Sequence, residues 1–119
     1  MTPKIFESEY RFCRILWEHE PINSTELVKL CREHLGWSKA TTYTVIRRLA
    51  ERGVLKNENA TVTSLVSREE AESAEIDALV QSRFDGSLPA FIAAFSRKKH
   101  LTEEQAAEIL AMIDDREEE

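Results

Sequence analysis

Apolar residues recur at helical spacing in the first half of the chain. Cys13 and Trp17 share one face of a helix predicted over about residues 7–19. Asn23 is an N-cap residue for a second helix, and Gly36 ends that helix. The apolar face of the second helix comprises Leu27, Leu30, Cys31 and either His34 or Leu35.

A third helix and a hairpin follow in the same half. Ser38 is an N-cap residue, and the pattern predicts a helix from there to about Arg52. Beyond Gly53 the residues become β-branched and alternating, with a turn signal at Asn57–Asn59 and an extended segment at Thr61–Val66. This pattern predicts a β-hairpin. The buried stripe of the third helix is expected to contain Thr42, Val45, Ile46 and Leu49.

The second half of the chain shows helical patterns only. Ser67 opens a Ser-x-x-Glu capping box before a helix that ends near Arg83. Asp85-Gly86 interrupts the pattern, and Ser87 and Thr102 begin two further helices. We therefore expect a module of three helices without strands.

The order of these elements predicts a mainly α fold with a small β-hairpin. A helix, a short extended piece at Pro21-Ile22, two helices and a hairpin (the wing) form a winged helix-turn-helix domain over residues 1–66. Residues 67–119 form a helical dimerisation domain, because their apolar stripes exceed what so small a unit can cover internally. The stripes expected to pack on a second copy are Ile76, Leu79 and Val80, then Leu88, Phe91, Ile92 and Phe95, then Ile109, Leu110 and Ile113.

Charge is divided unequally between the two halves. The whole chain carries a net charge of −6. Residues 1–66 hold 10 Lys and Arg against 8 Glu, whereas residues 67–119 hold 6 Lys and Arg against 14 Asp and Glu. Between Trp37 and Lys56, five basic residues accompany a single acid. A local basic stripe of this kind is typical of phosphate binding.

The third helix is therefore the predicted recognition helix for double-stranded DNA. Short polar and basic side chains on its outward face suit base edges and phosphates in the major groove. Lys56 in the wing adds a weak backbone contact, since Glu58 lies beside it. The residues predicted to bind DNA are Lys39, Thr41, Tyr43, Thr44, Arg47, Arg48 and Lys56.

Other classes of function find less support in the sequence. His19, His34 and His100 stand alone, without a nucleophile or paired carboxylates, so we expect no enzyme and no catalytic residues. Cys13 and Cys31 show neither zinc-ligand nor disulfide spacing, so no metal or cofactor is expected. The chain lacks a signal peptide and a membrane-spanning stretch, which favours the cytoplasm. A ligand-sensing winged helix and a winged-helix protein–protein interaction module remain the alternatives.

The sequence resembles the penicillinase-repressor family, the BlaI, MecI and CopY type of winged-helix transcriptional repressor. The matching segments are Glu9–Trp17, Ser24–Val28, Trp37–Leu49, Arg52–Leu55 and the stretch Phe91–Ile113. Trp37–Leu49 is the most specific, because its Ser/Thr-rich start and Arg-Leu end resemble the family's recognition helix. The resemblance implies a homodimer that binds inverted-repeat operators and represses resistance or transport genes.

Three departures from the family pattern affect what can be carried over. Ala40 and Tyr43 stand where members often have lysine and arginine. The operator sequence of those members therefore cannot be assigned to this chain. The paired cysteines of the copper-responsive branch are missing, which argues against release by a metal. In the antibiotic-responsive branch a membrane sensor-protease system leads to cleavage before a phenylalanine. The resemblance places that bond between Ala94 and Phe95, where the better-known members have asparagine before the phenylalanine.

Overall fold

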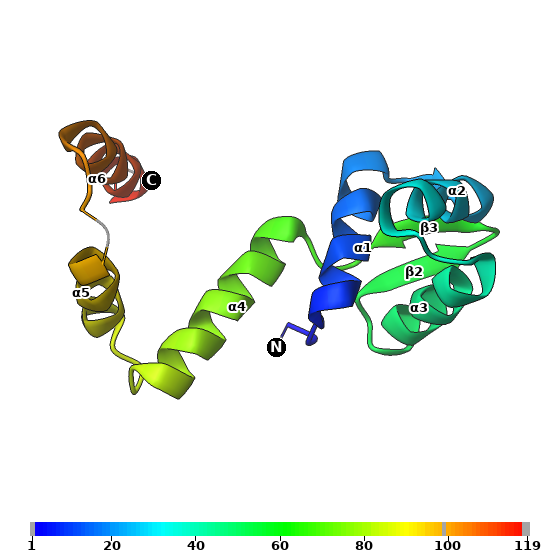
Figure 1. The fold of residues 1–119 in the computed structure, drawn as a ribbon, viewed down its shortest axis with the longest axis horizontal. Coiled ribbons are helices and arrows are strands. Elements are labelled where there is room, and N and C mark those ends of the chain that lie inside the picture. Colours follow the sequence, from blue (N-terminus) through cyan, green and yellow to red (C-terminus); the bar gives the residue numbers. More distant parts are fainter. Residues whose placement is uncertain (1, 99, 118–119) are drawn as a thin grey trace. The chain divides into compact units, whose positions relative to one another are not determined.

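A computed structural model describes residues 2–98 and 100–117 of the chain (Figure 1). The backbone divides into two compact units, one up to Ile76 and one from Asp77 onward. This division lies inside a helix that begins directly after the boundary predicted at residues 66 and 67. The elements in chain order are α1 (Glu7–His19), β1 (Ile22–Asn23), α2 (Ser24–Leu35), α3 (Lys39–Glu51), β2 (Leu55–Glu58), β3 (Thr61–Ser64), α4 (Arg68–Arg83), α5 (Leu88–Lys98) and α6 (Glu103–Glu117).

The first unit is a winged helix, as the sequence predicted. Helices α1, α2 and α3 accompany an antiparallel sheet with the strand order β1-β3-β2. The predicted hairpin is the pair β2–β3, in which Leu55 is opposite Ser64. Strand β1 adds a third member, because Ile22 pairs with Val62. Its two residues are too few to show an alternating pattern, so the sequence indicated only an extended piece there.

The tip of the wing lies further along the chain than the sequence predicted. Glu58 pairs with Thr61, so the turn consists of Asn59 and Ala60 and not of Asn57–Asn59. Both turn residues have positive φ, 52° at Asn59 and 59° at Ala60. Positive φ at both central positions is the requirement of a type I′ turn, whose twist matches that of the two strands. Asn57 and Glu58 remain in β2 as exposed strand residues.

The predicted helix ends in the first unit are confirmed by their hydrogen bonds. The Asn23 side chain accepts a bond from the Thr25 amide at 2.8 Å, and the Ser38 hydroxyl accepts one from the Thr41 amide at 3.1 Å. Each bond satisfies an amide that the first turn of a helix leaves free. Gly36 ends α2 with a left-handed φ of 70°, a conformation that glycine adopts without steric cost.

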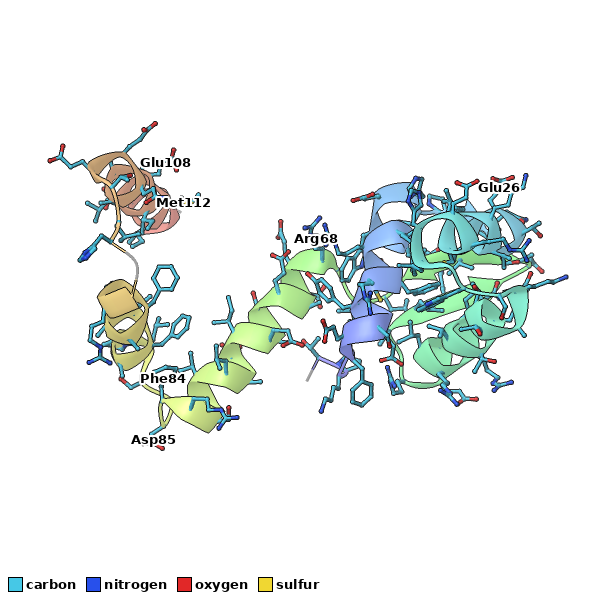
Figure 2. All side chains as sticks on the ribbon, viewed as in Figure 1. Glu26, Arg68, Phe84, Asp85, Glu108 and Met112 are labelled. Carbon is cyan, nitrogen blue, oxygen red and sulfur yellow. The ribbon has the colours of Figure 1, made fainter. Side chains whose placement is uncertain are left out.

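The helix boundaries of the second half follow the same chemistry. Ser67 and Glu70 form the reciprocal pair of a capping box at the start of α4. The hydroxyl of Ser87 accepts a bond from the Ala90 amide at the start of α5. Figure 2 labels Phe84 and Asp85 at the turn after α4, and Asp85 there has a φ of 49°. Helix α6 begins with a capping pair between Thr102 and Gln105.

The core of the first unit joins all three of its helices to the sheet. Phe12 and Leu16 of α1, Leu27 of α2, Leu49 of α3 and Val62 of β3 have no exposed surface. Two free thiols belong to the same core, Cys13 on α1 and Cys31 on α2. Burial raises the pKa of Cys13 to about 12 and that of Cys31 to about 11. Both thiols therefore stay protonated at neutral pH, and their burial agrees with their predicted places on helix faces.

Two polar contacts fasten the end of α1 to the strands and to the segment that precedes α4. A Glu20 carboxylate oxygen accepts bonds from both the amide and the hydroxyl of Ser64 in β3, each at 2.7 Å. The indole of Trp17 donates to the carbonyl of Val66 at 2.9 Å.

Among the described residues, no helix is both long and apolar enough to cross a membrane.

The start of α1 is joined to the end of α3 through a buried carboxylate. Glu9 is only 7% exposed, and its Oε1 accepts a bond from the Phe6 amide at 2.9 Å. The same oxygen forms an ion pair with the guanidinium of Arg52, the C-cap residue of α3. Arg52 also lies over the Phe6 ring, 5.3 Å from its centre. One carboxylate thus caps the start of α1 and joins it to the end of α3.

We expect Glu9→Ala to lower the free energy of unfolding by about 1–3 kcal/mol, because it leaves a partly buried guanidinium and an amide without their acceptor. The side chain of Arg52 is 32% exposed, so water can replace part of the lost interaction. Urea unfolding followed by circular dichroism measures the change. Glu7→Ala is the matched control, since Glu7 is an exposed acid in the same helical turn. Equal losses for the two variants would contradict the role assigned to Glu9.

Candidate nucleic-acid interface

Helix α3 is fixed to the core along one side. Thr42, Ile46 and Leu49 are buried, at 0%, 2% and 0% exposure. The hydroxyl of Thr42 donates to the Ser38 carbonyl at 3.1 Å, so this polar side chain is satisfied within its own helix. Val45 is half-buried beside this stripe. The buried side confirms the predicted stripe and determines which side chains of α3 face outward.

The outward side of α3 carries most of the residues predicted to bind DNA. Lys39, Thr41, Arg47 and Arg48 are exposed, and Thr44 is half-buried. Arg47 and Arg48 lie three and four residues after Thr44, on the side of α3 opposite the buried stripe. Among the residues that the structure describes, Lys39, Arg47 and Arg48 have no carboxylate oxygen within 4.0 Å. Their charges are therefore free to meet phosphates.

Tyr43 lies differently from the outward position that we expected. The side chain is half-buried and packs against the hydrophobic core. Its hydroxyl lies 3.4 Å from the hydroxyl of Ser24, the buried first residue of α2. A tyrosine can bury its ring while its hydroxyl keeps a polar partner. Tyr43 therefore joins the two helices of the helix-turn-helix, and Ser24 is a residue that sequence reasoning did not single out.

The wing carries one exposed basic side chain, Lys56. Lys56 is exposed on β2, and its Nζ lies 3.9 Å from a carboxylate oxygen of Glu58. This neighbour offsets part of the positive charge. A weak contribution of Lys56 to phosphate binding stays a prediction from the sequence.

The apolar stripes of the second half lie largely at the surface of the single chain. Leu88, Ile92 and Phe95 of α5 are 54%, 51% and 49% exposed. Phe91 is half-buried, and its ring meets that of Phe84 edge to face, with the ring centres 5.6 Å apart. The other exposed members of the predicted dimerisation set are Ile76 and Leu79 on α4 and Ile109, Leu110 and Ile113 on α6.

Val80 departs from this exposed set. Its side chain is only 7% exposed in the single chain. Its carbonyl accepts bonds from the amides of Phe84 and Gly86, where the chain turns between α4 and α5. We expected Val80 to face a second copy, but its surface is already covered within one chain.

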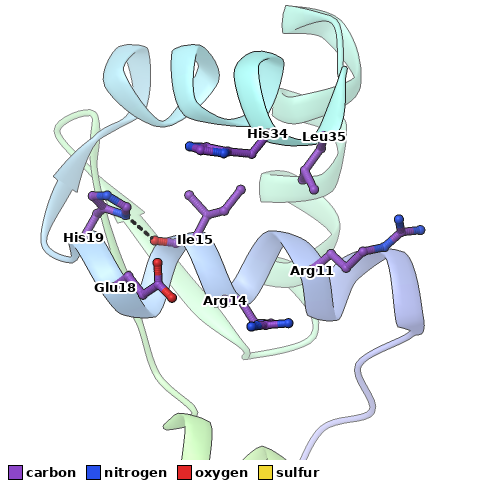
Figure 3. Close-up of a pocket in the computed structure, with 7 residues that line it drawn as sticks. All are labelled: Arg11, Arg14, Ile15, Glu18, His19, His34 and Leu35. Carbon is purple, nitrogen blue, oxygen red and sulfur yellow. Dashed lines mark hydrogen bonds between the residues drawn. The ribbon is translucent and has the colours of Figure 1, made fainter.

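A hollow between α1 and α2 contains two of the histidines. Figure 3 shows His34 and Leu35 of α2 facing Ile15 of α1, and the hollow measures about 270 Å³. His34 is exposed and Leu35 half-buried, so Leu35 is the residue that continues the apolar face of α2. The ring of His19 is hydrogen-bonded to the Ile15 carbonyl at 2.8 Å.

Within the described part of the chain, no cluster of His, Cys, Asp and Glu could hold a metal ion.

Comparisons with known proteins agree on one family. The family model described as penicillinase repressor matches residues 5–115. The penicillinase repressor of Bacillus licheniformis is 22% identical over 117 residues, which cover 95% of this chain and 91% of that protein. An uncharacterized 16.5 kDa protein of Latilactobacillus sakei, from the ptsI 3′ region, is 30% identical over 99 residues, 76% of this chain and 68% of that protein.

A solved structure agrees with the sequence relatives. The solution structure of the monomeric form of Bacillus licheniformis BlaI, in complex with the blaP half-operator, matches with a TM-score of 0.52 and 26% identity. The match covers 59% of this chain and 90% of that one. The resemblance inferred from the sequence motifs is thereby confirmed, together with the expectation of a DNA-binding repressor and not an enzyme. The chain belongs to the penicillinase repressor family.

Proposed function

We propose that this protein is a cytoplasmic homodimeric repressor that binds an inverted-repeat operator, in front of resistance or transport genes. The observation that carries the proposal is the outward side of α3. It presents two arginines, a lysine and two threonines on a helix whose opposite side is locked into the core. The solved relative, bound to a half-operator, supports the same use of a winged helix.

The side chains of α3 divide into two kinds by their chemistry. Thr41 and Thr44 can donate and accept hydrogen bonds, and their methyl groups suit contact with thymine. Arg47 and Arg48 can bind phosphates, or one of them can pair with both acceptors of a guanine. Lys39, at the first position of the helix, suits a phosphate. Tyr43 contributes to DNA binding indirectly, because its contact with Ser24 holds α3 against α2.

The double variant Arg47→Ala plus Arg48→Ala is expected to weaken operator binding and to flatten its salt dependence. A lost base contact costs about 1–3 kcal/mol of binding free energy at one base pair. Each lost phosphate contact lowers the steepness of log binding constant against log salt concentration by about 1. Fluorescence anisotropy with an operator duplex at several salt concentrations measures both quantities. Arg11→Ala plus Arg14→Ala, which removes two exposed arginines from α1, is the matched control. Unchanged affinity and slope in the α3 variant would contradict the proposed reading face.

The proposed dimer uses the exposed apolar side chains of α4, α5 and α6. Leu88, Ile92 and Phe95 occupy positions i, i+4 and i+7 and therefore share one face of α5. About half of each side chain is exposed in the single chain. Burial of such a face against its own copy is favourable, and a two-fold axis would match the symmetry of a palindromic operator.

Sedimentation of the full-length protein at micromolar concentration should therefore show a dimer. Ile92→Glu is expected to shift the protein toward monomer, because a charge would replace an apolar group in the interface. Ala93→Glu places the same charge on the other side of α5, where the side chain is also exposed, and should leave the dimer intact. A monomeric parent protein would overturn the proposed assembly.

Release from the operator is proposed to follow cleavage between Ala94 and Phe95. Both residues lie inside α5, where Ala94 is half-buried and Phe95 is 49% exposed. An isolated helix of this length is marginally stable, so local unwinding can expose the bond to a protease. A cut there would divide the apolar face of α5. Loss of the dimer would forfeit the avidity of two half-sites, about 10²–10⁴ in apparent affinity.

Producing cells treated with a cell-wall antibiotic should accumulate two fragments that meet at this bond. Intact-mass spectrometry of the repressor, sampled through induction, identifies the cut directly. Phe95→Asp removes the aromatic side chain after the bond and is expected to prevent the cut. Because Phe95 also belongs to the proposed dimer face, this result is judged by intact mass and not by operator binding. Ala93→Gln, in the same turn, should still be cut. Induction of target genes while the full-length chain persists uncut would exclude proteolysis as the release step.

A further inference from the structure

A hollow of about 480 Å³ lies beside the segment that precedes α1. Lys4, Ile5 and Phe6 line it together with Glu7 and Tyr10 of α1 and Glu75 of α4. All six residues belong to the first unit of the chain. The volume falls within the range of small-molecule sites, roughly 300–1,000 Å³. We call this hollow, which these six residues line, the arm hollow, after the N-terminal segment beside it.

The lining of the arm hollow combines aromatic surface with negative charge. The ring of Phe6 is open to solvent at 50% exposure, and Tyr10 is half-buried. Glu7 and Glu75 are exposed, and within the described residues neither has a basic nitrogen within 4.0 Å. Aromatic rings and carboxylates both attract cations, the ring through its negative face.

The Phe6 ring already holds two cations of the protein itself. The Nζ of Lys4 lies 4.8 Å from the ring centre, and the guanidinium of Arg52 lies 5.3 Å from it. Arg52 is tied to Glu9 by an ion pair and so cannot leave its position freely. Lys4 has no such partner among the described residues, and its exposed side chain can rotate into water. Its ammonium therefore occupies a place that another cation could take.

We propose that the arm hollow binds an amphipathic organic cation, a molecule with an ammonium group on an aromatic or aliphatic body. The cation displaces the ammonium of Lys4 from the Phe6 ring, and Glu7 and Glu75 offset its charge. The apolar body packs on the partly exposed ring of Tyr10, beside the buried Ile5. The hollow between α1 and α2 has the opposite character, because Arg11 and Arg14 line it, and should not bind the same molecule.

Benzyltrimethylammonium is the probe, and phenylacetate is the anionic control of similar size. Titration of the ¹⁵N-labelled full-length protein should give saturable shifts at residues 4–10 and 72–76 with the cation only. Lys4→Gln should tighten binding about two- to fivefold, because it removes the competing ammonium, and Glu75→Gln should weaken it by a similar factor. Lys29→Gln and Glu69→Gln make the same charge changes on exposed positions outside the hollow and should have no effect.

Tighter binding to Lys4→Gln is the decisive outcome, because a nonspecific attraction to a negatively charged protein would respond equally to Lys29→Gln. Shifts that do not saturate, equal shifts with phenylacetate, or an unchanged affinity in Lys4→Gln would each overturn the proposal. All four substituted side chains are exposed, and circular dichroism verifies that every variant is folded. The measurement needs no DNA, so its result is independent of the operator experiments.

Discussion

The contact between Glu9, Arg52 and the Phe6 amide is the interaction on which the first unit depends most. It joins the first turn of α1 to the residue that ends α3, and it lies at the edge of the core formed by Phe12, Leu16 and Leu49. A buried carboxylate is tolerated only when its oxygens find donors. Here one donor is the N-cap amide of the same helix, and the other is the guanidinium of Arg52 at the end of α3. The orientation of α3 is therefore fixed by a polar contact as well as by apolar packing.

The sequence predicted those features whose signals are local. The starts of α2, α3 and α4 follow from the N-cap residues Asn23, Ser38 and Ser67, and the buried stripe of α3 follows from its period. Strand β1 was beyond such reasoning, because its pairing partner Val62 lies far along the chain. The turn at Asn59-Ala60 was misplaced, since alanine gives no turn signal and the polar residues before it give a false one.

In the candidate interface, too, only features with local sequence signals were predicted. Exposed positions of α3 such as Arg47 and Arg48 were predicted correctly from helical spacing alone. Tyr43 and Val80 were not. Tyr43 meets Ser24 of α2, a neighbour that becomes adjacent only after folding, and Val80 is buried within the single chain. Tertiary neighbours, and not periodicity, decide the exposure of residues at the flank of a helix face.

The bond from Glu20 to Ser64 has a consequence for how this wing can change during evolution. Glu20 holds β3 partly through a backbone amide, an interaction that nearly any residue at position 64 would retain. The exposed residues of the wing, Lys56, Asn57 and Glu58, take no part in that attachment. They are therefore free to mutate without loosening the sheet, so the charge of the wing surface can change while the attachment of β3 to the end of α1 stays constant.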